Sequence, residues 1–303
     1  MAVTLNQLQA FLAVVRRGSV TAAAEELVVT QPSVSAAIAA LEREVGAELT
    51  ERAGRTLRPT AAGDAFAPYA ADVLGLLAQG ARAAREAAET ERATLRISAV
   101  TTAGEHLVPQ LVQAFREHRP ELEISLHVGN RDEVFRRIAD READVAIAGR
   151  VPHDGRLDAQ AFADNEFVLA CARSDPLARR SGISPDELTG RRWLVREPGS
   201  GTRRLAEEYL AAAGLRPELL TLGSNGAMKQ AARIGLGVAL LSRVAVELEL
   251  ELGRLATIRP RGGLPRRAWF VVRPAAGPAS EAAEEFVAFV TSPAARIVLS
   301  RAA

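Results

Sequence analysis

A change of pattern near Thr94 constrains this chain more than any other feature of its sequence. Before it, apolar residues recur at helical spacing; after it, short apolar runs alternate with amphipathic stretches. The runs cover 95–100, 123–128, 144–148, 167–171, 193–195, 237–241, 255–258 and 268–272, and the helical stretches cover 107–117, 133–140, 202–213, 227–234 and 281–290. This alternation predicts α/β units with mainly parallel sheets. Periodicity alone does not decide between one sheet and two lobes.

The N-terminal segment predicts three helices in succession. Apolar residues recur at helical spacing in the first: Leu5, Leu8, Leu12 and Val15. Ser19 can cap a short second helix over 20–27, and Thr30 with Pro32 just inside predicts the start of a third. The inward face of the third helix is formed by Val34, Ile38, Leu41 and Val45, and Gly46 supplies its stop.

A short basic β-hairpin, or wing, is predicted over 47–60. Arg52, Arg55 and Arg58 lie around Gly54, and Pro59 closes the segment. From 61 to about 91 a single helix follows with a heptad seam that thins to small residues: Phe66, Tyr69, Val73, Leu76, Gly80, Ala83 and Ala87. At 1.5 Å per residue this helix spans roughly 45 Å, too long to pack on a small head alone. We therefore expect it to pair with a second copy of the chain.

Composition gives the chain a core but no global electrostatic field. Of its 303 residues 48% are hydrophobic, and 38 basic against 37 acidic residues leave a formal charge of +1. The length predicts two or three domains, and any binding to nucleic acid must be local. No apolar stretch approaches the roughly 18 residues of a spanning helix, and the start lacks the pattern of a secretion signal. We expect a cytoplasmic protein that makes no membrane contact.

No catalytic or metal-binding set emerges from the residues. The histidines lack zinc-motif spacing, and the lone Cys171, in an apolar run, is expected to be buried and inert. The segment 199–201 (GSG) lacks the outer glycines of a nucleophile elbow, and 235–237 (GLG) lacks the third glycine of a dinucleotide loop. We predict no enzyme activity, no cofactor and no metal.

Five segments of the head occur in a telling order and spacing: 5–11 (LNQLQAF), 18–24 (GSVTAAA), 30–35 (TQPSVS), 38–42 (IAALE) and 57–63 (LRPTAAG). Together they resemble the winged helix-turn-helix of the LysR-type transcriptional regulators. Downstream, 196–203 (REPGSGTR) and 223–230 (GSNGAMKQ) resemble effector-domain segments of the branch that controls carbon-fixation and sulfur-assimilation operons.

The resemblance implies an N-terminal winged helix-turn-helix DNA-binding domain, a dimerising linker helix and a two-lobed α/β effector domain similar to periplasmic binding proteins. Carried onto this chain, the three parts are 1–60, 61–91 and 92–303, with a first lobe of 92–163 plus 267–303 and a second of 164–266. It also implies a homodimer or homotetramer that binds double-stranded promoter DNA, with RNA polymerase as a partner.

The start of the third helix is the expected reader of DNA. A recognition helix places N-terminal side chains in the major groove, so Gln31, Ser33 and Ser35 are positioned to reach base edges, and Gln31 suits adenine. Thr30 and Ser33 with the wing residues Arg52 and Arg55 are expected to hold the backbone, and Pro32 belongs to the same expected DNA-binding segment. Against this, residues 1–60 contain six arginines and six glutamates. The alternative is a protein-docking head in which Thr30 merely caps the helix.

Ligands of α/β folds bind beyond the carboxyl ends of strands, near helix N-termini. Thr101 and Thr102 follow one predicted strand, and the resemblance places the effector near them and near 200–202. The expected effector-binding residues are Thr101, Thr102, Ser200, Gly201, Thr202, Arg203 and Asn225, which suit a carboxylate, sulfate or phosphorylated metabolite. Each hydroxyl could equally be an ordinary cap. A solute-binding module with an oligomerising head, and an enzyme, stay open as alternatives.

Overall fold

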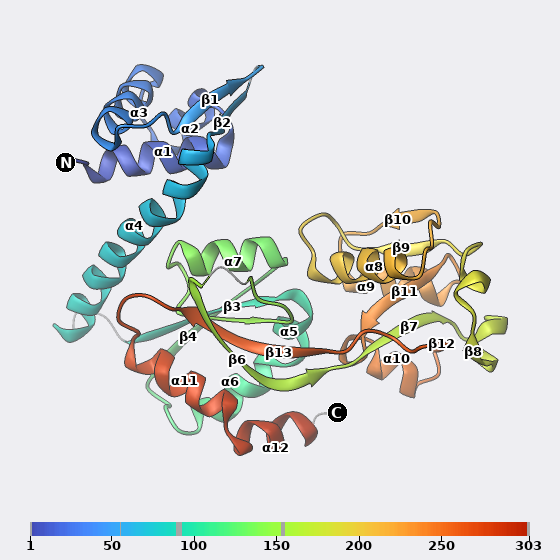
Figure 1. The fold of residues 1–303 in the computed structure, drawn as a ribbon. Helices are drawn as coiled ribbons and strands as arrows, with labels where there is room; N and C mark the ends of the chain where they lie inside the picture. The colour runs from blue at the N-terminus through green and yellow to red at the C-terminus, as the bar shows by residue number, and fades with distance from the viewer. Residues whose placement is uncertain (1, 55, 89–92, 153–154, 302–303) are drawn as a thin grey trace. The chain divides into compact units, whose positions relative to one another are not determined.

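The computed structural model describes residues 2–54, 56–88, 93–152 and 155–301 (Figure 1). The chain divides into two compact units, one of residues 1–91 with 139–142 and one of residues 92–138 with 143–303. The expected winged-helix head, long helix and two-lobed α/β remainder are confirmed. The expected domain limits stay predictions, and the last part of the 61–91 helix lies outside the described residues.

The head follows the capping signals of its sequence. Helix α1 spans Leu5–Arg17, α2 spans Val20–Leu27 and α3 spans Gln31–Val45, and their N-caps are Thr4, Ser19 and Thr30. Strands β1 (Thr50–Ala53) and β2 (Thr56–Pro59) form the antiparallel wing, and α4 runs over Ala61–Ala87. Because each cap side chain accepts a first-turn amide, the helix starts are fixed locally.

Two apolar clusters hold the head together. One joins Phe11, Leu41, Leu49 and Ala70, and the ring centroids of Phe11 and Phe66 lie 5.7 Å apart. The other lies between α1, α2 and α3 and includes Ala13, Ala23, Val34 and Ile38. Gly63 lets the start of α4 approach the wing, since a Cβ there would lie 2.0 Å from the Leu49 carbonyl oxygen.

The first lobe is built on a five-stranded sheet of order β4-β3-β5-β13-β6. Its strands are β3 (Thr94–Val100), β4 (Glu123–Gly129), β5 (Val145–Ala148), β6 (Leu157–Asn165) and β13 (Arg267–Pro274). The pairs β3–β4 and β3–β5 are parallel, whereas β13 is antiparallel to both β5 and β6.

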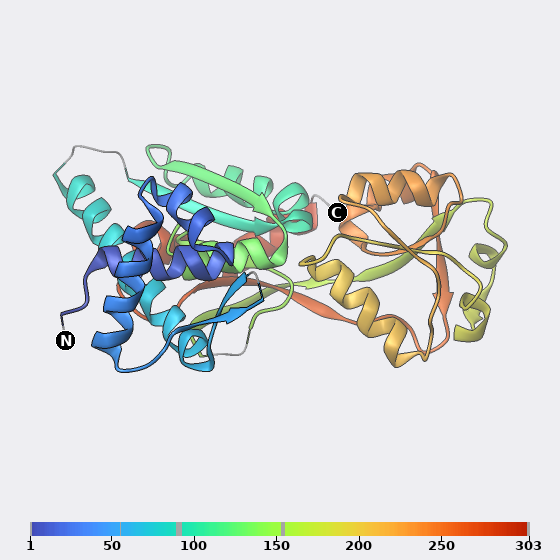
Figure 2. The ribbon, with the colours of Figure 1, turned by 90° about the horizontal axis from the view of Figure 1, so that it is seen from above.

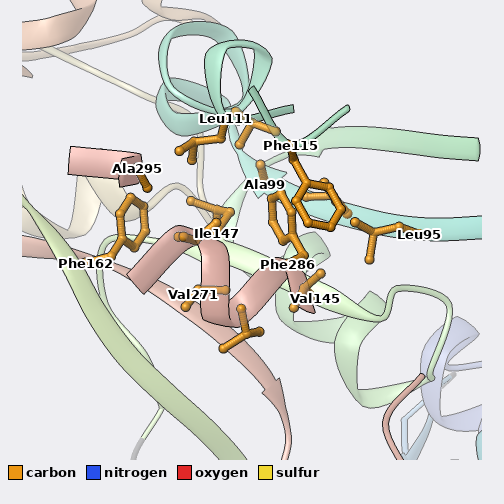
Figure 3. Close-up of a cluster of buried hydrophobic side chains, with 14 of the residues drawn as sticks. Leu95, Ala99, Leu111, Phe115, Val145, Ile147, Phe162, Val271, Phe286 and Ala295 are labelled. Atoms are coloured by element: carbon orange, nitrogen blue, oxygen red, sulfur yellow. The ribbon is translucent and has the colours of Figure 1, made fainter. Parts of the chain in front are cut away.

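Side-chain alternation along these strands covers both faces of the sheet. Val145 and Ile147 face α6 (Val108–Arg116), α11 (Glu281–Thr291) and α12 (Pro293–Arg301), in the cluster shown in Figure 3. Ala146 belongs to the opposite cluster, under α7 (Arg131–Ala139). Successive strand residues point to opposite faces, so one short apolar run serves two layers of helices. The short helix α5 (Thr101–His106) follows β3 directly.

The second lobe holds a six-stranded sheet of order β10-β9-β11-β7-β12-β8. Its strands are β7 (Phe167–Ala172), β8 (Ser181–Ile183), β9 (Trp193–Val195), β10 (Leu219–Thr221), β11 (Val238–Ser242) and β12 (Leu255–Pro260). Leu169 and Cys171 pack with α8 (Gly201–Ala212) on one face, and Val168 and Ala170 with α9 (Asn225–Arg233) on the other. Shorter helical pieces are η1 (Pro176–Arg179), η2 (Pro185–Leu188), η3 (Arg243–Ala245) and α10 (Glu247–Glu251).

Two chain crossings join the lobes. One passes from β6 to β7 and the other from β12 to β13, as Figure 2 shows from above. At the crossings Arg267 pairs in register with Asn165, and the Ser242 hydroxyl lies 2.7 Å from the Asn165 amide oxygen. The described helices include none that is long and apolar enough to cross a membrane.

Candidate functional site

A cavity lies between the two lobes, where β3 ends and α8 begins. Thr101, Thr102 and Arg131 line it from the first lobe, and Ser200 and Gly201 line it from the second. Asn165 at the end of β6, Ser242 at the end of β11 and Trp269 on β13 also line it, and all three are buried. The cavity therefore sits at the carboxyl ends of strands and between two bodies joined by thin connections, a usual place for a ligand.

The wall from the second lobe offers hydrogen-bond donors. The first amides of an α-helix have no partner within the helix, and Ser200, Gly201 and Thr202 at the start of α8 all line the cavity. Ser200 is only 7% exposed, yet within the described part of the chain its hydroxyl makes no capping hydrogen bond. The helix start and this hydroxyl together favour a negatively charged ligand.

Positive charge exceeds negative charge at the described wall of the cavity. Five arginines line it, Arg131, Arg150, Arg196, Arg204 and Arg267, against one carboxylate, Glu208. Glu208 pairs with Arg150 and with Arg267, the latter at 3.0 Å. Among the residues that the structure describes, the Arg204 side chain has no hydrogen bond or ion pair.

Arg131 carries the clearest sign of a missing partner. Its Nε is buried and makes no hydrogen bond to any residue that the structure describes, while Nη1 lies 3.4 Å from an Asp132 oxygen. Burial, with Arg204 nearby, lowers the pKa of the Arg131 guanidinium below its ordinary value, although arginine stays charged at neutral pH. A buried polar group without a partner is costly. An anion in the cavity would offset the cost of burying the Arg131 guanidinium and its repulsion by Arg204.

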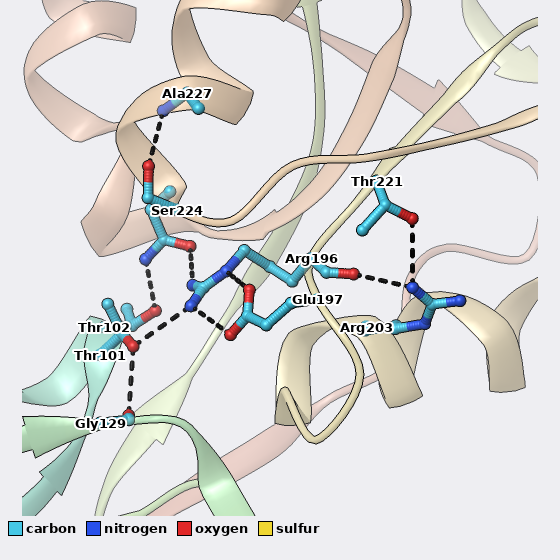
Figure 4. Close-up of polar contacts among 10 residues, drawn as sticks. Thr101, Thr102, Gly129, Arg196, Glu197, Arg203, Thr221, Ser224 and Ala227 are labelled. Atoms are coloured by element: carbon cyan, nitrogen blue, oxygen red, sulfur yellow. Dashed lines mark hydrogen bonds and ion pairs between the residues drawn. The ribbon is translucent and has the colours of Figure 1, made fainter.

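Arg196 organises the side of the cavity drawn in Figure 4. Its guanidinium, 5% exposed, binds both Glu197 oxygens at 2.7 and 2.9 Å. Its Nη1 donates to the Asn225 side-chain oxygen at 2.8 Å, and its Nη2 to the Thr101 hydroxyl at 3.3 Å. Asn225 in turn donates to the Thr102 hydroxyl at 3.0 Å. These bonds join the lobes across the cavity edge.

The expected effector residues divide by placement. Thr101, Thr102, Ser200, Gly201 and Thr202 line the cavity, and Asn225 lies behind it as the partner of Thr102. Arg203 is not among the lining residues. It binds Glu207 at 2.7 Å, and Figure 4 shows its bonds to the Thr221 hydroxyl and the Arg196 carbonyl. The neighbouring Arg204 lines the cavity in its stead. Sequence reasoning missed Arg196. Its place in the segment 196–203, as a charged residue directly after an apolar strand, could have indicated it, but the sequence gives no sign that its side chain is buried.

The face of α3 that carries the expected DNA residues is exposed. Gln31, Pro32, Ser33 and Ser35 are all exposed, while Val34, Ile38 and Leu41 point into the core. The Thr30 hydroxyl caps α3 by accepting from the Ser33 amide and lies 2.8 Å from the Ser33 hydroxyl, and the Gln31 amide binds Thr21. Arg52 is exposed on β1, and Arg55 lies outside the described residues. The cap and an exposed polar face coexist.

The metal-ligand residue types and the lone cysteine were the other candidates for chemistry. Among the described residues, no group of three or more histidine, cysteine or carboxylate side chains is placed to hold a metal ion. Cys171 is fully buried, and burial raises the pKa of its thiol to about 12.

Comparisons with known proteins agree over nearly the whole chain. Residues 5–64 match the bacterial regulatory helix-turn-helix protein, lysR family, and residues 88–294 match the LysR substrate binding domain. The HTH-type transcriptional regulator CbbR of Sinorhizobium medicae is 38% identical over 94% of this chain and 92% of its own length. The HTH-type transcriptional activator CmpR of Synechocystis is 33% identical over 89% of this chain and 88% of its own.

Solved structures extend the likeness to the fold. The CcmR regulatory domain of Synechocystis PCC6803 in complex with 2-PG is 30% identical and covers 66% of this chain and 96% of that one, at a TM-score of 0.63. CbnR, a LysR family transcriptional regulator, is 22% identical and covers 95% of this chain and 98% of that one, at a TM-score of 0.58.

Proposed function

The chain belongs to the LysR family of transcriptional regulators, and from this premise we propose that it binds promoter DNA through its head and responds to a small anion held between its lobes. Its relatives are regulators, not enzymes. We place it in the cytoplasm, as a homodimer or homotetramer that contacts RNA polymerase at the promoter.

The exposed face of α3 supports the DNA-binding part of the proposal. Gln31 and Ser35 are assigned to base edges, and Thr30 and Ser33 to the backbone beside them, with Pro32 in the same segment. Arg52 on the wing, with Arg55, is assigned to phosphates. A dimer would place two such helices about one helical turn apart, roughly 34 Å, on an imperfect dyad.

The single observation that carries the effector class is the donor-rich, cationic wall of the cavity. It combines the unpaired Arg131 Nε, the unpaired Arg204 side chain and the uncapped start of α8. A carboxylate, sulfate or phosphorylated metabolite would satisfy these groups. The CcmR regulatory domain binds 2-PG, so 2-PG is the first compound to test here.

Calorimetric titration of the full chain with 2-PG, inorganic phosphate and sulfate tests this class. Arg204→Ala is expected to weaken anion binding about tenfold or more, because a charge-assisted contact is lost. Arg203→Ala, the matched control, is expected to weaken it by less than about threefold, since that side chain is bound outside the cavity. Equal losses in the two variants would contradict this assignment.

Gel shifts with the DNA upstream of the gene that encodes this chain, repeated over a series of salt concentrations, test the DNA-binding part. Binding is expected to weaken steeply with salt, and Gln31→Ala with Arg52→Ala to reduce both affinity and the salt slope. Arg180→Ala, an exposed arginine of the second lobe, is the control. Salt-insensitive binding, or ligand binding without DNA binding, would favour a solute-binding module whose head only oligomerises.

A further inference from the structure

The two adjacent threonines at the cavity have different hydrogen-bonding duties. A guanidinium only donates hydrogen bonds, so the Asn225 atom that faces Arg196 at 2.8 Å must be the amide oxygen. This fixes the amide orientation without reference to its far side, and places the Asn225 NH2 group against Thr102. Asn225 is only 2% exposed, so water does not compete for these bonds.

The Thr102 hydroxyl therefore accepts from Asn225 at 3.0 Å and retains its own hydrogen. No described residue accepts that hydrogen, and Thr102, 6% exposed, lines the cavity. Thr101 differs, because its hydroxyl accepts from Arg196 and is 3.2 Å from the Gly129 carbonyl, to which it donates. Its hydrogen is already used.

We infer that Asn225 is a positioning residue that turns the Thr102 hydroxyl into a fixed hydrogen-bond donor to the effector, while Thr101 closes the lobe junction. The inference rests on the proposed function, since it deepens the anion site described there. A donor held in this way selects an acceptor oxygen, such as that of a carboxylate, sulfate or phosphate group, and rejects a ligand that presents a hydrogen at this point. Arg196 supports the arrangement indirectly, because it holds the Asn225 amide in this orientation.

The test compares isosteric variants by calorimetric titration of the full chain with 2-PG and inorganic phosphate. Thr102→Val removes the hydroxyl and is expected to lower affinity about tenfold or more, and Thr102→Ser to restore most of it. Thr101→Val is expected to lower anion affinity by about threefold at most. Thermal unfolding of each variant checks that it is folded.

Asn225→Asp separates positioning from packing. Aspartate keeps the shape and the bond to Arg196 but only accepts, so Thr102 must turn its hydrogen towards it. The substitution also adds a negative charge, which lowers anion affinity whether or not Thr102 is present. The loss from Asn225→Asp is expected to be about threefold or more larger in the natural background than in the Thr102→Val background.

The outcomes are distinguishable. If the natural chain binds none of the tested anions, the proposed effector class is overturned, and this inference with it. Anion binding by the natural chain with equal losses for Thr101→Val and Thr102→Val, or equal Asn225→Asp losses in both backgrounds, overturns this inference alone.

Discussion

At the scale of single residues, Val28 stands in a conformation that its side chain disfavours. Its φ is 56°, in the left-handed region, at the turn between α2 and α3, and the side chain is 89% exposed. A β-branched residue in this conformation is strained, and because Val28 is exposed, no buried apolar contact offsets the strain. The turn between α2 and α3 therefore carries backbone strain that a residue tolerant of the left-handed region would relieve.

Val28→Asn is expected to raise the free energy of unfolding by about 1 kcal/mol, because asparagine tolerates the left-handed region. Urea unfolding followed by far-UV circular dichroism measures this. Val29→Asn, at the next exposed position, is the control and should give no gain. A destabilised Val28→Asn chain would show that the valine side chain has a packing role.

Cys171 is expected to be unreactive in the folded chain. Burial raises its thiol pKa from 9.0 to about 12, so the thiolate is scarcer at pH 8 than in the unfolded chain. The neutral thiol favours the folded state below pH 9, and this contribution is lost as the pH rises towards 12. Labelling with a disulfide reagent at pH 8 should be slow until urea is added. Rapid labelling of folded protein would contradict the burial.

The sequence could predict the cavity's hydroxyls but not its charge. Thr101, Thr102 and Ser200 follow from their position after strands and before a helix, a local pattern. Arg131 and Asn165 come from distant segments, and only the fold brings them to the same cavity. For the same reason Arg203 and Arg204 could not be told apart, since the exact phase of α8 decides which one lines the cavity.

At the scale of elements, the long helix shows both the reach and the limit of periodicity. The expected seam ran through Phe66, Tyr69, Val73 and Leu76. Phe66 instead packs on Phe11, and the exposed apolar stripe consists of Tyr69, Val73 and Leu77, at intervals of four residues. Part of the apolar face of α4 packs into the core of the head. The apolar surface of α4 that is left for a second copy therefore differs from the expected seam.

Val73→Glu is expected to weaken self-association and, through it, DNA binding, because a charge would enter an apolar helix pair. Light scattering after size exclusion measures the mass. Ala78→Glu, exposed on another face of α4, is the control. An unchanged mass for Val73→Glu would exclude this stripe as the dimer contact.

Two glycines of α4 give opposite expectations. Gly63→Ala would force a Cβ to within 2.0 Å of the Leu49 carbonyl, and should cost about 2 kcal/mol or more of stability. The Cβ of Gly80→Ala would meet no described neighbour within 4 Å, and the substitution should gain about 1 kcal/mol from helix propensity. Urea unfolding of the two variants checks the pair, and a tolerated Gly63→Ala would mean that the wing moves freely.

Strand β6 shows why some elements escaped the sequence. Residues 157–165 have no apolar run, and only Phe162 and Asn165 are buried. The strand exists because it pairs with β13 from Leu157 opposite Pro274 to Asn165 opposite Arg267, a partner more than 100 positions away in sequence. Pairing across that separation is a property of the tertiary fold.

At the scale of the whole molecule, the alternation of strands and helices predicted the fold class but not the strand order. Two sheets arise because the chain crosses between lobes at 165–167 and returns at 260–267. We propose that an anion between these lobes alters DNA binding by a head distant in sequence. Such coupling requires unequal anion affinity for two arrangements of the oligomer and is reciprocal.

The most direct measurement is fluorescence anisotropy of a labelled upstream DNA fragment, titrated with the chain at fixed salt, with and without saturating 2-PG. We expect 2-PG to shift the DNA dissociation constant about fivefold or more, and Arg204→Ala to need about tenfold more 2-PG for the same shift. Superimposable curves, under conditions in which calorimetry shows 2-PG bound to the natural chain, would contradict the account.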